Sequence, residues 1–152
     1  MKNLFLAALT IILVTTASAQ NKTANSLSYK TAIGVKVWNG AGATLKTFLT
    51  EKDALEFIGF FNGDGTRITG LYELHGDLNT EGNLKWYVGF GAHVGLYKLD
   101  NTVFGLDGVI GIDYKFANAP INLALDWQPS LELKKNYGFN SNWGGFAIRF
   151  TL

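Results

Sequence analysis

Few residues of this chain could take part in catalysis or metal binding. It has two histidines, His75 and His93, and no cysteine, which excludes a thiolate metal site and a disulfide framework. An imidazole can bind a metal or act as a general base near neutral pH, but it needs further ligands or a nucleophile at a suitable spacing. Neither histidine has such a neighbour in the sequence. We therefore expect hydrogen-bonded structural histidines, no metal, no cofactor and no enzymatic activity.

Charge and composition limit the possible partners. Charged residues make up 16% of the 152 residues, against about 25% in ordinary soluble domains. The chain is rich in glycine and phenylalanine, with 18 and 11 residues. Basic and acidic residues nearly balance, at 13 and 12, whereas nucleic-acid binding needs clustered positive charge. Nucleic acid is therefore not an expected partner, and the low charge would coat a water-facing surface poorly.

The amino-terminal residues have the pattern of a signal peptide. Lys2 is followed by the apolar run Leu4 to Val14 and by Ala17-Ser-Ala, a small-residue cleavage site, which predicts a signal peptide over residues 1–19. The apolar run is shorter than the roughly 20 residues of a transmembrane helix. Residues 20–30 are polar and predict a flexible leader. The mature chain is therefore expected to be exported.

From residue 31 onward, apolar and polar residues alternate with a period of two, which is typical of strands with one polar face. Turn residues separate the alternating segments, and no helical period persists. Eight segments follow this pattern: Ala32 to Trp38, Ala43 to Leu49, Ala54 to Phe61, Ile68 to Leu78, Leu84 to Tyr97, Gly105 to Phe116, Ile121 to Leu131 and Trp143 to Leu152. The sequence predicts an all-β chain with one domain, a closed antiparallel barrel of about eight strands over residues 31–152.

Alternation alone leaves open which face of the barrel points inward. A soluble, lipocalin-like barrel puts its apolar face inside, whereas a transmembrane barrel puts it against lipid. The apolar faces here are bulky and continuous, and the polar faces are rich in glycine, as a narrow lumen requires. These features favour the transmembrane alternative. The polar face, expected to line the lumen with both histidines, carries a charge network of Lys36, Lys46, Glu56, Glu73, Asp77, Lys85, Asp113, Lys115, Asp126 and Arg149.

Two segments resemble those of a known family. They are Thr50-Glu-Lys-Asp-Ala-Leu-Glu, a tight turn leading into a strand, and Gly144-Gly-Phe-Ala-Ile-Arg-Phe-Thr-Leu, an alternating carboxyl-terminal strand. On these residues the chain resembles the small OmpA/OmpX-like outer-membrane β-barrel proteins of Gram-negative bacteria, in a short-loop form. The resemblance implies an outer-membrane location, contact with outer-membrane lipid and insertion by the barrel-assembly machinery. Such proteins usually end in an aromatic residue, whereas this chain ends in Leu152, two residues after Phe150.

Several functions are compatible with this resemblance. We expect a monomer with a structural or surface-interaction role and a lumen plugged by charges. A narrow pore or small-molecule carrier is the first alternative. A lipid A-modifying enzyme, as some small barrels of this kind are, is a further one, but Ser130 and Ser141 lie far in sequence from either histidine. A soluble lipocalin-like binding barrel is the last alternative.

The turns also predict the charge pairs and the topology. Counting outward from them sets Asp77 opposite Lys85 and Glu56 opposite Lys46, and one register of the last hairpin sets Asp126 beside Arg149. An even strand number puts both chain ends on one side of the membrane. The turns at 51–53, 79–83 and 117–120 are expected on that periplasmic side. The longest loop, 132–142 with Lys134, Lys135 and Tyr137, is expected outside.

Overall fold

The chain forms an all-β barrel in the computed structural model, which describes residues 29–78, 83–98, 102–133 and 138–152. The predicted signal peptide and residues 20–28 of the predicted leader lie outside the described residues. The strands are β1 (Thr31–Trp38), β2 (Gly40–Phe48), β3 (Asp53–Asn62), β4 (Gly65–Asp77), β5 (Leu84–Tyr97), β6 (Val103–Lys115), β7 (Ile121–Trp127), β8 (Ser130–Glu132), β9 (Gly138–Asn140) and β10 (Gly144–Thr151).

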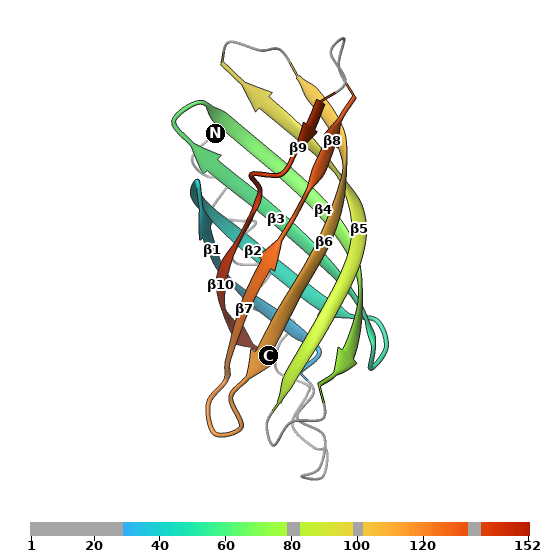
Figure 1. Ribbon diagram of the computed structural model, residues 1–152. Coiled ribbons are helices and arrows are strands. Elements are labelled where there is room, and N and C mark those ends of the chain that lie inside the picture. Colours follow the sequence, from blue (N-terminus) through green and yellow to red (C-terminus); the bar gives the residue numbers. More distant parts are fainter. Residues whose placement is uncertain (1–28, 79–82, 99–101, 134–137) are drawn as a thin grey trace.

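The sheet closes on itself, and every pairing is antiparallel. Consecutive strands pair from β1 to β6, β7 pairs with both β6 and β10, and β10 returns to β1. The short strands β8 and β9 extend β7 and β10, because β8 pairs with β6 and β9 pairs with β8. The result is a closed eight-stranded antiparallel barrel with tilted strands (Figure 1), and the expected fold class is confirmed.

The expected strand Ile121 to Leu131 is interrupted after Trp127, which corrects the prediction of a continuous strand. Proline has no amide hydrogen to donate to a ladder, and Pro129 marks the interruption. Its carbonyl still accepts a hydrogen bond from the Gly108 amide at 2.8 Å, so β8 stays in register with β6.

A matching interruption separates β9 from β10. Gly144 pairs with Trp127, whereas Asn140 pairs with Ser130, so one extra residue is accommodated between the two strands. The indole nitrogens of Trp38 and Trp127 each donate a hydrogen bond of 2.9 Å to a main-chain carbonyl of residues 141–142. The segment 132–142, predicted as a loop, therefore contains strand β9. Its residues Lys134, Lys135 and Tyr137 lie outside the described residues.

Three strands begin two or three residues earlier than the sequence predicted, at Gly40, Gly65 and Val103. The segments around the two glycines looked like turns, but glycine weakens an alternation pattern without breaking the backbone ladder. The hairpin between β1 and β2 is tight, since Trp38 pairs with Gly40 across Asn39 alone. Gly40 has a φ of 152°, a conformation that favours glycine.

The start of β1 and the end of β10 lie together at one end of the barrel. Ala32 pairs with Thr151, and the Leu152 amide donates to the Thr31 carbonyl at 2.8 Å. The β2–β3 turn and the β6–β7 turn lie at this same end, as the even strand number predicted, and Figure 1 shows the carboxyl terminus beside the β6–β7 turn at the lower end. We call it the terminal end and the opposite one the distal end.

The two faces of the barrel differ sharply in polarity. Large apolar side chains cover the outer face, including Phe90 at 68% and Phe139 at 70% exposure. The charged and polar side chains that alternate with them point inward. Exposure of the apolar face to water would be costly, so a lipocalin-like barrel, with its apolar face inside, does not fit. Among the described residues, no helix is long and apolar enough to cross a membrane.

Candidate functional site

The lumen holds the ionisable groups of the barrel and is the candidate functional site. Within the described residues, the fully buried charged side chains are Lys36, Lys46, Glu56, Arg67, Glu73, Asp107, Asp113, Asp126 and Arg149. Glycine makes room for these long side chains. At Gly145 an added Cβ would come within 3.0 Å of Lys36 Cγ, and at Gly111 within 2.6 Å of Tyr87 Cζ.

Lys46 on β2 is at the centre of the ion cluster nearer the terminal end. Its Nζ lies 2.7 Å from Glu73 Oε2 and 3.7 Å from Glu56 Oε2. A third carboxylate, of Asp113, lies 3.9 Å away, and the ammonium sits 4.2 Å from the centroid of the Tyr87 ring. The three carboxylates come from β3, β4 and β6, so this one ammonium links several strands through the interior.

Arg149 on β10 crosses the lumen to Glu56 on β3. Its Nη2 donates to Glu56 Oε1, and its Nη1 donates to Asn122 Oδ1 at 3.1 Å. Thr44 Oγ1 donates to the same Glu56 oxygen at 2.5 Å. Charge-assisted hydrogen bonds of this kind are stronger than neutral ones, and the one between Arg149 and Glu56 joins strands that do not pair with each other.

Lys36 on β1 forms a further close ion pair, with Asp126 on β7. Lys36 Nζ lies 2.6 Å from Asp126 Oδ2. The Tyr87 hydroxyl donates to the same oxygen at 2.7 Å. The tyrosine therefore connects this pair to Lys46, which lies over its ring.

Tyr29, just before β1, contacts lumen residues at the terminal end. Its hydroxyl donates to Asp113 Oδ2 at 3.1 Å, and its ring packs edge-on against Phe48. Burial and the adjacent Asp113 carboxylate raise the pKa of the Tyr29 hydroxyl, because both disfavour the phenolate. Phe48 in turn packs against His75, which stacks on Tyr87. His75 therefore sits among aromatic rings, inside the lumen as predicted.

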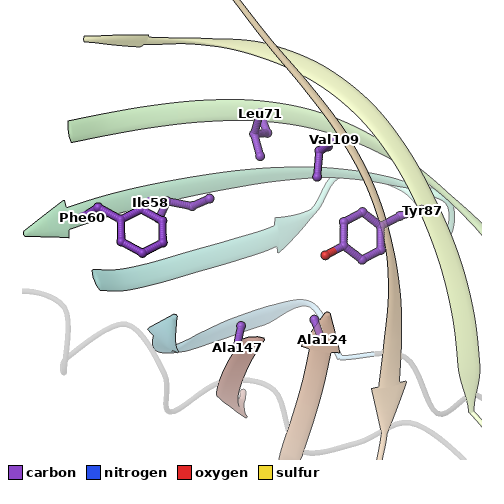
Figure 2. Packing of buried hydrophobic residues seen from close by; sticks show 7 residues of the cluster. All are labelled: Ile58, Phe60, Leu71, Tyr87, Val109, Ala124 and Ala147. Atoms are coloured by element: carbon purple, nitrogen blue, oxygen red, sulfur yellow. The ribbon is translucent and has the colours of Figure 1, made fainter. Parts of the chain in front are cut away.

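Apolar side chains separate this ion cluster from a second polar group nearer the distal end. Inward positions on β6 run from Asp113 through Val109 to Asp107, and those on β4 include Leu71 between Glu73 and Arg67. Figure 2 shows the apolar side chains directed toward one another across the interior. They are Ile58, Phe60, Leu71, Val109, Ala124 and Ala147, together with Tyr87, which also contacts the ion cluster through Lys46 and Asp126.

The second polar group is organised around Asp107. Arg67 Nη2 and Gln128 Nε2 donate to Oδ1, the latter at 3.2 Å. His93 Nδ1 lies 2.7 Å from Oδ2. The Arg67 guanidinium also lies 4.2 Å from the ring centroid of Trp143, which packs against Phe60.

The structure places most of the predicted lumen residues inside, but three of them lie at the rim. Asp77 and Lys85 are opposite each other, as predicted, with Lys85 Nζ 3.8 Å from Asp77 Oδ1. The Asp77 side chain is nevertheless 72% exposed. Lys115 donates to the carbonyls of Phe116 and Ala119. These residues follow the lumen-facing pattern, but β4, β5 and β6 extend past the closed part of the barrel there.

The third predicted pair is wrong. Arg149 is opposite Asn122, and Asp126 is opposite Gly145, so Asp126 and Arg149 are not neighbours across the ladder. The structure instead pairs Asp126 with Lys36. The predicted pair Glu56 and Lys46 does stand in register. Arg67 and Asp107 were not among the predicted lumen residues. Each is six residues from a predicted one on the same strand, Arg67 from Glu73 and Asp107 from Asp113, so the period of two places them on the inward face.

A metal centre has no support in this arrangement. Within the described part of the chain, no group of three or more His, Cys, Asp or Glu side chains is placed to hold a metal ion. Most lumen carboxylates are occupied by basic or hydrogen-bonding side chains. The chemistry that the network provides is cross-linking of the barrel interior by ion pairs.

A closed eight-stranded antiparallel barrel with an apolar outer face and a charged interior is the fold of the small outer-membrane β-barrels. In solved structures, the chain is similar to the crystal structure of the N-terminal β-barrel domain of Pseudomonas aeruginosa OprF. The TM-score is 0.58 and the sequence identity 16%, with 80% of this chain and 95% of that domain covered. No protein-family model and no curated protein sequence matches the chain. The resemblance to the OmpA-like barrels that the sequence indicated is thus confirmed at the level of the fold.

Proposed function

We propose that this chain is an exported outer-membrane protein with a structural or surface-interaction role, whose lumen is closed to ions by its buried charge network. The observation that carries the proposal is the reversed polarity of the barrel. Its outer face is apolar around the circumference, and its interior holds four basic and five acidic buried side chains among the described residues. A lipid bilayer solvates such an outer face, and a closed barrel satisfies its backbone hydrogen bonds without water.

The closure to ions is supported by how the charges are held. Lys46, Arg149 and Lys36 are each within ion-pair distance of a buried carboxylate from another strand. A permeating ion would have to break such pairs and then cross the apolar side chains between the two polar groups. Either step is costly, because a buried charge without a partner is poorly solvated.

The partners in this proposal are outer-membrane lipid and, during insertion, the barrel-assembly machinery, and the protein acts as a monomer without enzymatic activity. The test of location is cell fractionation combined with gel mobility. We expect the mature protein in the outer-membrane fraction, with different mobilities in boiled and unboiled samples. Recovery from the soluble periplasm with one mobility would contradict the proposal.

A further inference from the structure

The polar group nearer the distal end has features that ion pairing alone does not explain. We call it the Asp107 cluster: Arg67 on β4, His93 on β5, Asp107 on β6, Gln128 between β7 and β8, and Ser130 on β8. All five residues are at most 4% exposed. They come from neighbouring strands and form one wall of the lumen.

Asp107 fixes the orientation of three of its neighbours. Because Gln128 Nε2 donates to the carboxylate, the amide oxygen Oε1 is the atom left over. Because His93 Nδ1 faces the carboxylate, a neutral imidazole carries its hydrogen there and leaves a lone pair on Nε2. Arg67 uses Nη2 on Asp107 and keeps the hydrogens of Nη1.

These remaining atoms have no hydrogen-bond partner in the described protein. They are Arg67 Nη1, His93 Nε2, Gln128 Oε1 and Ser130 Oγ. The first three each belong to a group whose other polar atom already binds Asp107, so they surround the same carboxylate. Ser130 is the cross-strand partner of Asp107. Buried polar atoms are nearly always paired, so several unpaired ones in one place need partners such as bound water or a ligand.

We propose that the Asp107 cluster binds a small uncharged solute that carries hydroxyl groups. Arg67 Nη1 offers a donor, His93 Nε2 and Gln128 Oε1 offer acceptors, and Ser130 Oγ can do either. A hydroxyl group both donates and accepts, so a polyol matches this mixed set. An anion would be repelled by the lone pairs of His93 Nε2 and Gln128 Oε1, and a cation would be repelled by the Arg67 guanidinium. Because Arg67 and Asp107 neutralise each other, the cluster has no net charge that would attract an ion.

An aromatic side chain covers the cluster. Trp143 is half-buried and covers the Arg67 guanidinium on the side facing Phe60. On that side of the barrel, the short β1–β2 hairpin already ends at Trp38 and Gly40. A solute entering from the distal end would therefore have to displace the Trp143 ring to reach the cluster.

The test is a titration of the folded mature protein in detergent micelles, labelled with ¹⁵N-histidine and prepared without glycerol. Ethylene glycol and glycerol are the probes, and acetate and methylammonium are the charged controls. We expect the polyols alone to shift the His93 Nε2 resonance saturably. His75 lies in the other polar group, where its ring stacks on Tyr87, so it reports any effect of the polyols that is not specific to the Asp107 cluster, and its resonances should shift less than those of His93.

Matched serine variants separate a site from a solvent effect. Ser130→Ala should still fold, because Oγ has no protein partner to lose, and should weaken glycerol binding by about two- to tenfold, the value of one hydrogen bond. Ser141→Ala, the same change outside the lumen, should bind glycerol like the wild type. An unsaturable or absent His93 response, an equal response of His75, or a response to acetate alone would overturn the proposal. The titration does not depend on whether the lumen conducts ions, so it can fail independently of the proposed function.

Discussion

Arg149 and Glu56 are 93 residues apart in sequence and form a buried ion pair across the lumen, from β10 to β3. Their strands do not pair with each other, so this contact exists only when the barrel has closed. It belongs to a network in which Glu56 also faces Lys46. The pair therefore links closure of the sheet to neutralisation of its interior.

Removing the Glu56 charge should destabilise the barrel strongly. Glu56→Gln leaves Arg149 without its carboxylate and Lys46 with one fewer, and stranding a buried charge costs about 3–5 kcal/mol. The free energy of unfolding in urea, measured on the protein folded in lipid vesicles, gives the loss. Glu51→Gln, at an exposed turn position, is the matched control and should change it by less than about 0.5 kcal/mol. Equal losses in the two variants would contradict the network.

A double-mutant cycle should show that Asp126 couples to Lys36. Because Lys36 Nζ lies 2.6 Å from Asp126 Oδ2, Lys36→Met and Asp126→Asn together should cost less than the sum of the singles, by about 0.5–3 kcal/mol. The coupling of Asp126 to Arg149, from a second cycle, should be smaller. A larger coupling in the second cycle would restore the pairing that the sequence predicted.

The inward and outward faces could be predicted from the sequence because the period of two is a local property of each strand. The alternation along each strand correctly predicted that Lys36, Glu73 and His93 face the lumen. The same alternation would place Arg67 inside, but the predicted strand began only at Ile68, so Arg67 fell in the predicted turn. Asp107 could have been predicted as a lumen residue, because it lies on the same face of one continuous strand as Asp113.

Pairing across the lumen could not be predicted in the same way. The contacts of Arg149 with Glu56, and of Lys36 with Asp126, depend on the stagger and radius of the closed barrel, which no single hairpin specifies. The Asp126–Arg149 prediction failed because it assumed a register for the last hairpin. The extra residue between β9 and β10 and the interruption at Pro129 make that register hard to count.

Glycine at position 111 should be required for packing of the lumen. A Cβ there would lie 2.6 Å from Tyr87 Cζ and 2.7 Å from Asp126 Cβ, so Gly111→Ala should cost about 1–3 kcal/mol through overpacking. At Gly59 the nearest atom would be 3.8 Å away, and Gly59→Ala should be tolerated. Chemical denaturation of both variants compares them. Similar midpoints would show that Tyr87 can move aside freely.

The cost of a charged residue on the outer face should depend on how deeply it lies in the bilayer. Phe90 lies near the middle of β5 and Phe139 on β9 at the distal end, and both are about equally exposed. In a bilayer, Phe90→Arg should cost about 2–4 kcal/mol and Phe139→Arg at most about 1 kcal/mol. The measurement is unfolding from phospholipid vesicles. A barrel that faces water would tolerate both substitutions equally.

The most direct test of a barrel closed by its own charges is electrical recording from the purified, folded wild-type protein in a planar lipid bilayer. With Lys36, Lys46 and Arg149 held by carboxylates from other strands, we predict that insertion gives no steady current above that of the bare membrane. Steady single-channel conductance of large amplitude in the wild-type protein would contradict the account and would favour a pore.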